Sequence, residues 1–151
     1  MPLTVVKLAV VRSDPVNGTI NPKAIPGAIV EYQIIVTNPS ANAVDSDSVM
    51  VNDPLPDHID MRVDDIASLG SGPVQFVDGS PSSGLGYTFT SLGSATDDVD
   101  FSSDDGATWT YQPVPDADGV DSSVTDIRIN PKGAFAGNNA QFTLKFRVRI
   151  K

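Results

Sequence analysis

Apolar and polar residues alternate with a period of two along much of this chain, the pattern of β-strands whose two faces meet different surroundings. The last segment, residues 140–151, is the clearest case. Its inward-facing set is Phe142, Leu144, Phe146, Val148 and Ile150. Residues 27–38 alternate in the same way. No useful window shows the three-and-four spacing of a helix, so we expect an all-β protein.

Twelve glycines and twelve prolines divide the chain into short pieces, as turns between strands do. The predicted strands are 3–12, 27–38, 47–53, 58–66, 73–78, 85–91, a hairpin of 98–103 with 107–112, 124–130 and 140–151. We expect about eight or nine mostly antiparallel strands at the spacing of a β-sandwich.

The first and last predicted strands differ in how their side chains are distributed. In the last strand, the outward face is basic, with Lys145, Arg147, Arg149 and Lys151. These charges indicate either a solvated face that blocks edge pairing or a basic stripe that docks on an acidic neighbour.

The first strand is apolar on both faces, which is unusual for a strand near a chain terminus. Its apolar positions include Leu3, Val5, Val6, Leu8, Val10 and Val11. One interpretation is a strand that crosses between the two sheets of its own sandwich. The other is a strand donated to a neighbouring subunit.

The segment that follows, residues 13–26, contains three prolines and resembles a linker. It can return the first strand to its own domain or carry it outward. The domain prediction is therefore an N-terminal strand (1–12), a connector (13–26) and a β-sandwich domain (27–151).

Length and composition place this chain among single globular domains. It has 151 residues, of which 40% are hydrophobic, and no cysteine. That length can bury a core without disulfides or metals. No apolar run of eighteen residues is present, so we expect no membrane span. No signal-peptide pattern occurs in residues 1–30.

The net charge of −9 is distributed unevenly. Residues 1–40 carry three basic and two acidic side chains, residues 41–126 one basic and seventeen acidic, and residues 127–151 six basic and none acidic. A strongly acidic middle argues against nucleic-acid binding, which needs a positive surface. The asymmetry favours head-to-tail contact between copies.

A search for catalytic groupings finds none, and we expect a protein that is not an enzyme. His58 is the only histidine, and no phosphate-binding loop or zinc motif is present. Asp116, Asp118 and Asp121 alternate around a glycine and form a candidate calcium site. Calcium is the only cofactor that the sequence suggests.

Residues 14–38, ending in Val-Thr-Asn, together with Asp53-Pro54-Leu55-Pro56, resemble the conserved repeat domain of unknown function in bacterial and archaeal surface proteins. The resemblance covers about the first 60 residues. It implies a secreted immunoglobulin-like sandwich at the cell surface. Members of that family usually occur as tandem repeats, whereas this chain has one copy with a longer, more acidic second half.

A second segment is similar to the Asp-box of sialidases and related proteins, which is a structural hairpin away from the active site. Its residues are Ser102, Asp104, Gly106, Thr108 and Trp109. The Asp side chain is expected to accept turn amides, the glycine to take a positive φ, and the indole to anchor the hairpin.

Three functional hypotheses follow from these observations. The first is a structural subunit of an extracellular filament that polymerises with copies of itself by donating its first strand. The second is a monomeric adhesion or stalk module on the cell surface. The third is a calcium-dependent glycan-binding module, which predicts exposed aromatic rings near Tyr87, Trp109 or Tyr111.

Overall fold

The computed structural model describes all 151 residues and contains nine strands and no helix. The strands are β1 (Thr4–Ser13), β2 (Ile29–Asn38), β3 (Val51–Pro54), β4 (Ile59–Arg62), β5 (Val74–Asp78), β6 (Val99–Ser102), β7 (Val120–Asp121), β8 (Asp126–Ile129) and β9 (Ala140–Ile150).

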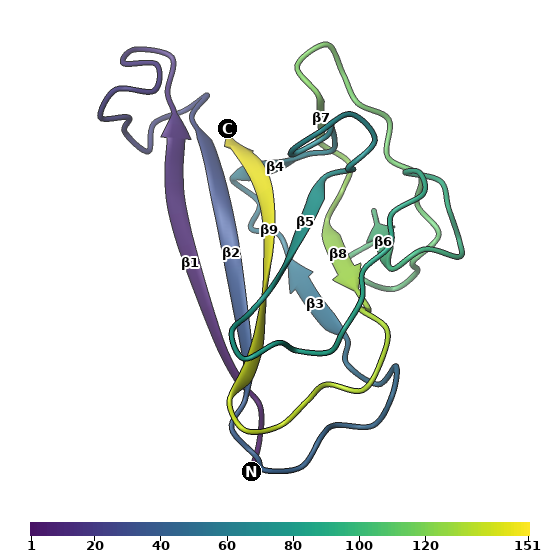
Figure 1. The fold of residues 1–151 in the computed structure, drawn as a ribbon. Helices are drawn as coiled ribbons and strands as arrows, with labels where there is room; N and C mark the ends of the chain where they lie inside the picture. Colours follow the sequence, from purple (N-terminus) through teal and green to yellow (C-terminus); the bar gives the residue numbers. More distant parts are fainter.

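The strands form two antiparallel sheets that pack against each other (Figure 1). The larger sheet has the order β1-β2-β9-β4-β7, and β5 pairs with β9 beside β4. The smaller sheet has the order β3-β8-β6. The all-β class is confirmed, and the arrangement is consistent with a β-sandwich. The immunoglobulin-like topology stays a prediction.

Strand β9 lies at the centre of the larger sheet, and its alternation supplies one buried face. It pairs with β2 along one side and with β4 and β5 along the other. Phe142 lies between Phe76 and Phe135, with ring centroids 5.4 and 5.3 Å away. Burying such a ring contributes about 1.5–3 kcal/mol, so this aromatic group is a main source of core stability.

Asn38 ends β2 with a side chain that is almost fully buried. Its amide nitrogen donates to the carbonyl oxygens of Asn42, Phe135 and Ala136, at 3.0, 3.3 and 3.1 Å. Its side-chain oxygen accepts the amide of Ser40 at 3.1 Å. One side chain thus joins the end of β2 to the segment that leads into β9.

Some predicted strands are loops in the structure. Residues 85–91 have only an isolated bridge, between Gly86 and Lys132. In 107–112, only Tyr111 bridges to Phe101. Conversely, the two-residue strand β7 has no counterpart among the predicted strands. No helix in the structure has the length and apolar character needed to cross a membrane.

Candidate self-assembly surface

Strand β1 is the edge strand of the larger sheet and pairs with β2 only (Figure 1). Their antiparallel register runs from Thr4 opposite Thr37 to Ser13 opposite Ile29, with an irregularity after Val11. The interpretation of a strand that crosses between the two sheets is therefore wrong, because β1 stays in one sheet. Its other edge pairs with no strand.

The apolar side chains of β1 are exposed on both of its faces. Val5 is 62% exposed on the face shared with the buried residues of β2. On the outer face the exposed fractions are 50% for Val6, 46% for Leu8 and 37% for Val10. Leu3 and Val11 are half-buried and pack on the core. We call residues Leu3 to Val11 the assembly strand.

Two charged residues of β1 are paired with acids of the same chain. The ammonium of Lys7 lies 2.8 Å from Oδ1 and 2.7 Å from Oδ2 of Asp53, on β3 of the smaller sheet. Arg12 donates to Glu31 on β2 at 2.6 Å. Burial opposes ionisation of Glu31, but hydrogen bonds from Arg12 and Gln33 outweigh it and lower its pKa. Charged side chains commonly limit the pairing of edge strands, and both charges of β1 are already paired with acids of the same chain.

The connector between β1 and β2 is closed by the side chain of Asp14. Its Oδ1 accepts the amides of Val16 and Asn17, at 2.7 and 2.6 Å. Its Oδ2 accepts the side-chain amide of Asn17 at 3.0 Å and the backbone amide of Lys23. The hydrogen bonds from Asn17 are the main reason that the pKa of Asp14 falls well below its ordinary value. The predicted connector is therefore an ordered loop, and Asp14 was not singled out from the sequence.

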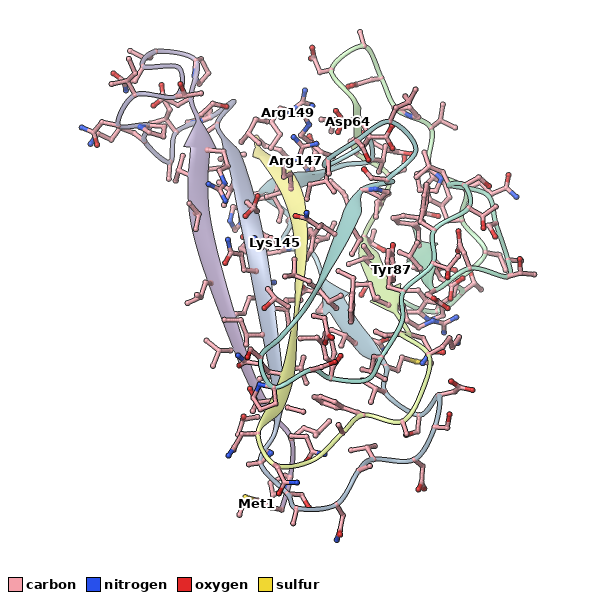
Figure 2. All side chains as sticks on the ribbon, viewed as in Figure 1. Met1, Asp64, Tyr87, Lys145, Arg147 and Arg149 are labelled. Atoms are coloured by element: carbon pink, nitrogen blue, oxygen red, sulfur yellow. The ribbon has the colours of Figure 1, made fainter.

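Three of the four basic residues at the end of the chain lie near carboxylates of the same chain, and Figure 2 shows Asp64 beside Arg147. Arg147 lies 3.5 Å from Asp64, and Arg149 lies 3.3 Å from Asp60 and from Asp118. Lys151 lies 3.2 Å from Asp60, while Lys145 has no carboxylate partner. Burial, with the nearby charge of Arg62, lowers the pKa of Arg147.

The interpretation of this basic face as protection of an edge is wrong, because β9 is paired on both sides. The acidic neighbours belong to strands and loops of the same molecule. Docking of the face on another subunit stays a prediction.

The turn from Ser102 to Trp109 is closed by the Asp104 side chain. Asp104 accepts the backbone amide and hydroxyl of Thr108, each at 2.8 Å, and the hydroxyl of Ser102 at 2.7 Å. Gly106 has a φ of 77°. The guanidinium carbon of Arg128 lies 4.6 Å from the centre of the Trp109 ring. These contacts make the turn rigid.

The loop proposed for calcium uses its carboxylates within the chain. Oδ1 of Asp116 accepts the amides of Asp118 and Val120, at 2.9 and 3.0 Å. The buried Asp121 accepts the hydroxyl of Tyr111 at 2.9 Å. The structure contains no group of three or more acidic, histidine or cysteine side chains arranged to hold a metal ion. Calcium binding stays a prediction from the sequence alone.

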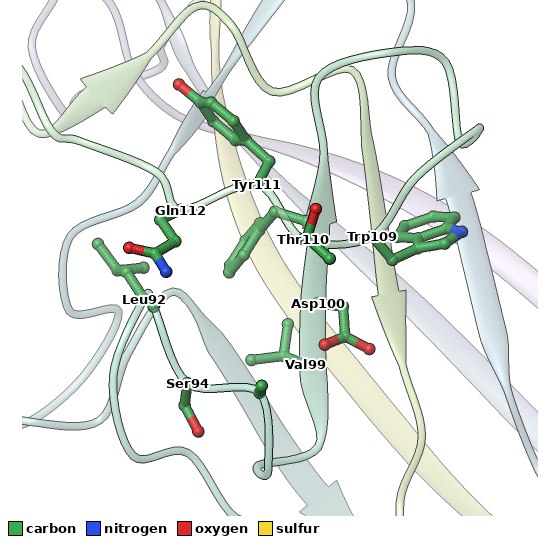
Figure 3. A pocket seen from close by; sticks show the side chains of 11 residues that line it. Leu92, Ser94, Val99, Asp100, Trp109, Thr110, Tyr111 and Gln112 are labelled. Carbon is green, nitrogen blue, oxygen red and sulfur yellow. The ribbon is translucent and has the colours of Figure 1, made fainter.

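A cavity of about 260 Å³ lies beside the turn, lined by Leu92, Ser94, Asp100 and Gln112 among others (Figure 3). Trp109 and Tyr111 also line this cavity. Glycan binding stays a prediction. Tyr87, whose pKa is raised by burial and by Asp97 and Asp98, lies apart from this site.

Comparisons of this chain with protein families, with curated proteins and with solved structures found no match. The fold itself defines the class: an all-β protein of two packed antiparallel sheets. Its main unusual surface is the assembly strand at an open sheet edge.

Proposed function

We propose that this protein is a structural subunit of an extracellular filament or surface assembly, and that it polymerises head-to-tail by exchange of β1. The observation that supports this is an edge strand with apolar residues exposed on both faces. Such a strand promotes association unless charge or cover blocks it. The extracellular setting follows from the resemblance of residues 14–38 to surface repeats.

Burial of the apolar side chains of the assembly strand by a neighbouring subunit would favour association. Full burial of a Val or Leu side chain contributes about 1.5–3 kcal/mol. Val5, Val6, Leu8 and Val10 are already partly covered, so the remaining gain is roughly half of that for each. Exchange of β1 alone rebuilds the same ladder and leaves these exposed fractions unchanged. The gain of several kcal/mol, before the entropy lost on association, therefore requires the neighbouring subunit also to cover the faces of β1.

An acceptor for a donated strand is already present at the edge of β2. The register between β1 and β2 shows that this edge takes a β1 strand in antiparallel orientation. If the connector opens, β1 of one copy can form the same ladder with β2 of the next. Donor and acceptor are different surfaces, so transfer of β1 from each copy to the next propagates as a fibre when the rotation between copies does not close into a ring.

The test compares the full chain, a variant lacking residues 1–12, and V6S/L8S, by sedimentation and negative-stain imaging. V6S/L8S keeps the backbone of β1 while removing apolar surface from its outer face. We expect uniform fibres from the full chain and weaker assembly from both variants. A full chain that stays monomeric at high concentration, with the amides of β1 protected from exchange, would overturn the proposal.

The second candidate is a monomeric adhesion or stalk module, and the pairing of β1 with β2 in the same chain favours it. This candidate predicts two-state unfolding that is independent of protein concentration. It also predicts that V6S/L8S has the same sedimentation behaviour as the wild type.

A further inference from the structure

Asp53 is a buried acid whose side chain has a partner on the other sheet. The residue is 7% exposed and lies on the face of β3 that it shares with the fully buried Ile127. The carboxylate receives its one side-chain hydrogen bond from Lys7, and no other group donates to it. The pair therefore joins β1 of the larger sheet to β3 of the smaller sheet.

Removal of β1 would leave this carboxylate without a cation. A buried charge that has lost its partner is strongly unfavourable, more so than a buried pair. The same removal would uncover the ring of Tyr32, which lies 4.3 Å from the Lys7 ammonium. An empty acceptor edge therefore selects a strand that brings a positive charge to this position.

Lys7 also determines which register of β1 is accepted. It is the only charged side chain among residues 2–11. A shift of β1 by one residue along β2 would place Val6 or Leu8 at this position. It would also move every side chain of β1 to the opposite face of the sheet. A shift by two would place Val5 or Ala9 opposite the carboxylate. Only the observed register pairs Asp53 with a cation.

We infer that Asp53 is the recognition group for the β1 strand of a second copy, and that its ion pair with Lys7 fixes the register of the exchanged strand. The partner is an extended strand with one lysine between apolar residues of the same face. This inference rests on the proposed function, because it assumes that β1 is exchanged between copies.

The test exchanges the two charges between chains. K7E places two acids together within one chain, and D53K places two lysines together. In a mixture of the two variants, the β1 strand of K7E meets the lysine introduced by D53K, and the unchanged β1 strand of D53K meets the Asp53 of K7E. Both trans pairs are then complementary, whereas neither variant is complementary with itself.

The measurement is self-association by sedimentation velocity, after each sample is refolded from urea so that strands can exchange. In each single variant the repulsive pair is present in the closed monomer and in the exchanged ladder alike, so we expect its self-association to change little. We expect the equimolar mixture to assemble roughly thirtyfold more strongly than either variant alone, with alternating labelled subunits shown by energy transfer. The double variant K7E/D53K should assemble alone.

The outcomes separate the inference from the proposed function. If the wild type and K7E form fibres but the mixture of K7E and D53K assembles no more strongly than either variant alone, exchange stands and the recognition role of Asp53 is lost. If K7E/D53K is stable and monomeric, like the wild type, and the mixture gains nothing, the pair acts within one chain and both proposals fail.

A second pair of variants keeps the test valid if D53K does not fold, as judged by circular dichroism. K7M keeps the Asp53 carboxylate without a cation, whereas D53N keeps Lys7 without an acid. In a mixture of the two, the Lys7 strand of D53N meets the Asp53 of K7M, so we expect the mixture to assemble more strongly than either variant alone. A mixture that gains nothing over K7M and D53N would overturn the inference.

Discussion

At the residue scale, the amide of Asn38 holds together segments that are far apart in the chain. Replacing it by alanine leaves the carbonyl oxygens of Asn42 and Ala136 and the backbone amide of Ser40 without their partner, whereas the Phe135 oxygen keeps its hydrogen bond from the Val44 amide. We expect N38A to lower the free energy of unfolding by about 2–4 kcal/mol. Urea denaturation measures this, and N42A, at an exposed neighbour, is the control. Equal losses in the two variants would contradict the assigned role.

Asp78 gives stability that depends on pH. Hydrogen bonds from the hydroxyls of Ser82 and Ser83 lower its pKa from 3.8 to about 2. The folded state therefore favours the charged form. This contribution is fully present above the unfolded pKa and is lost as the pH falls from 3.8 towards 2.

We expect D78N to be less stable than the wild type at neutral pH, with a difference that shrinks below about pH 4. Urea unfolding at a series of pH values gives the free energy of unfolding against pH for D78N and for the wild type. D57N is the matched control, because the Asp57 carboxylate forms no hydrogen bond and its curve should follow the wild type. Parallel curves for D78N and the wild type would refute this linkage.

The hydrogen bonds and ion pairs of a residue can be predicted from the sequence only where both partners are close along the chain. Asp104 and Thr108 are four residues apart, so their hydrogen bonds belong to a local turn. Lys7 and Asp53 are 46 residues apart. No local pattern connects them, because the contact depends on how the two sheets pack.

At the scale of elements, alternation predicted strands well where a ladder also exists. β2 and β9 lie close to the predicted ranges. Residues 85–91 alternate too, with Leu85 buried and Tyr87 and Phe89 half-buried, but they pack on the core without a neighbouring ladder. Strand β7 has two residues, which is too short to show a period. The central position of β9 could not be predicted, since alternation does not give strand order.

The two faces of the larger sheet should respond differently to truncation. F142A removes a ring with no exposed surface, and we expect it to cost about 3–5 kcal/mol. V77A changes a residue of β5 that is 38% exposed, and its effect should stay within about 0.5 kcal/mol. Denaturant unfolding of both variants tests this, and a large effect of V77A would show that the outer face is covered.

At the scale of the whole molecule, the charge of −9 opposes association of identical subunits. The assembly strand contains no acid. Salt should therefore screen the repulsion between two negatively charged subunits more than it weakens the contact that the assembly strand makes. We expect self-association to strengthen as sodium chloride rises from roughly 20 to 200 mM. Sedimentation at several salt concentrations measures this, and D57N/D105N, with two fewer charges, should associate more readily at low salt. Weaker association at high salt would indicate a contact dominated by ion pairs.

The two chain termini lie at opposite ends of the molecule (Figure 1). Thr4 is level with Thr37 at one end of β2, and Arg149 is level with Ile29 at the other. Tension between Met1 and Lys151 would therefore pull β1 and β9 in opposite directions along β2. The ladder hydrogen bonds would bear that force together, in shear, and would not open one after another from an end. The fold is thus suited to resist stretching along its long axis.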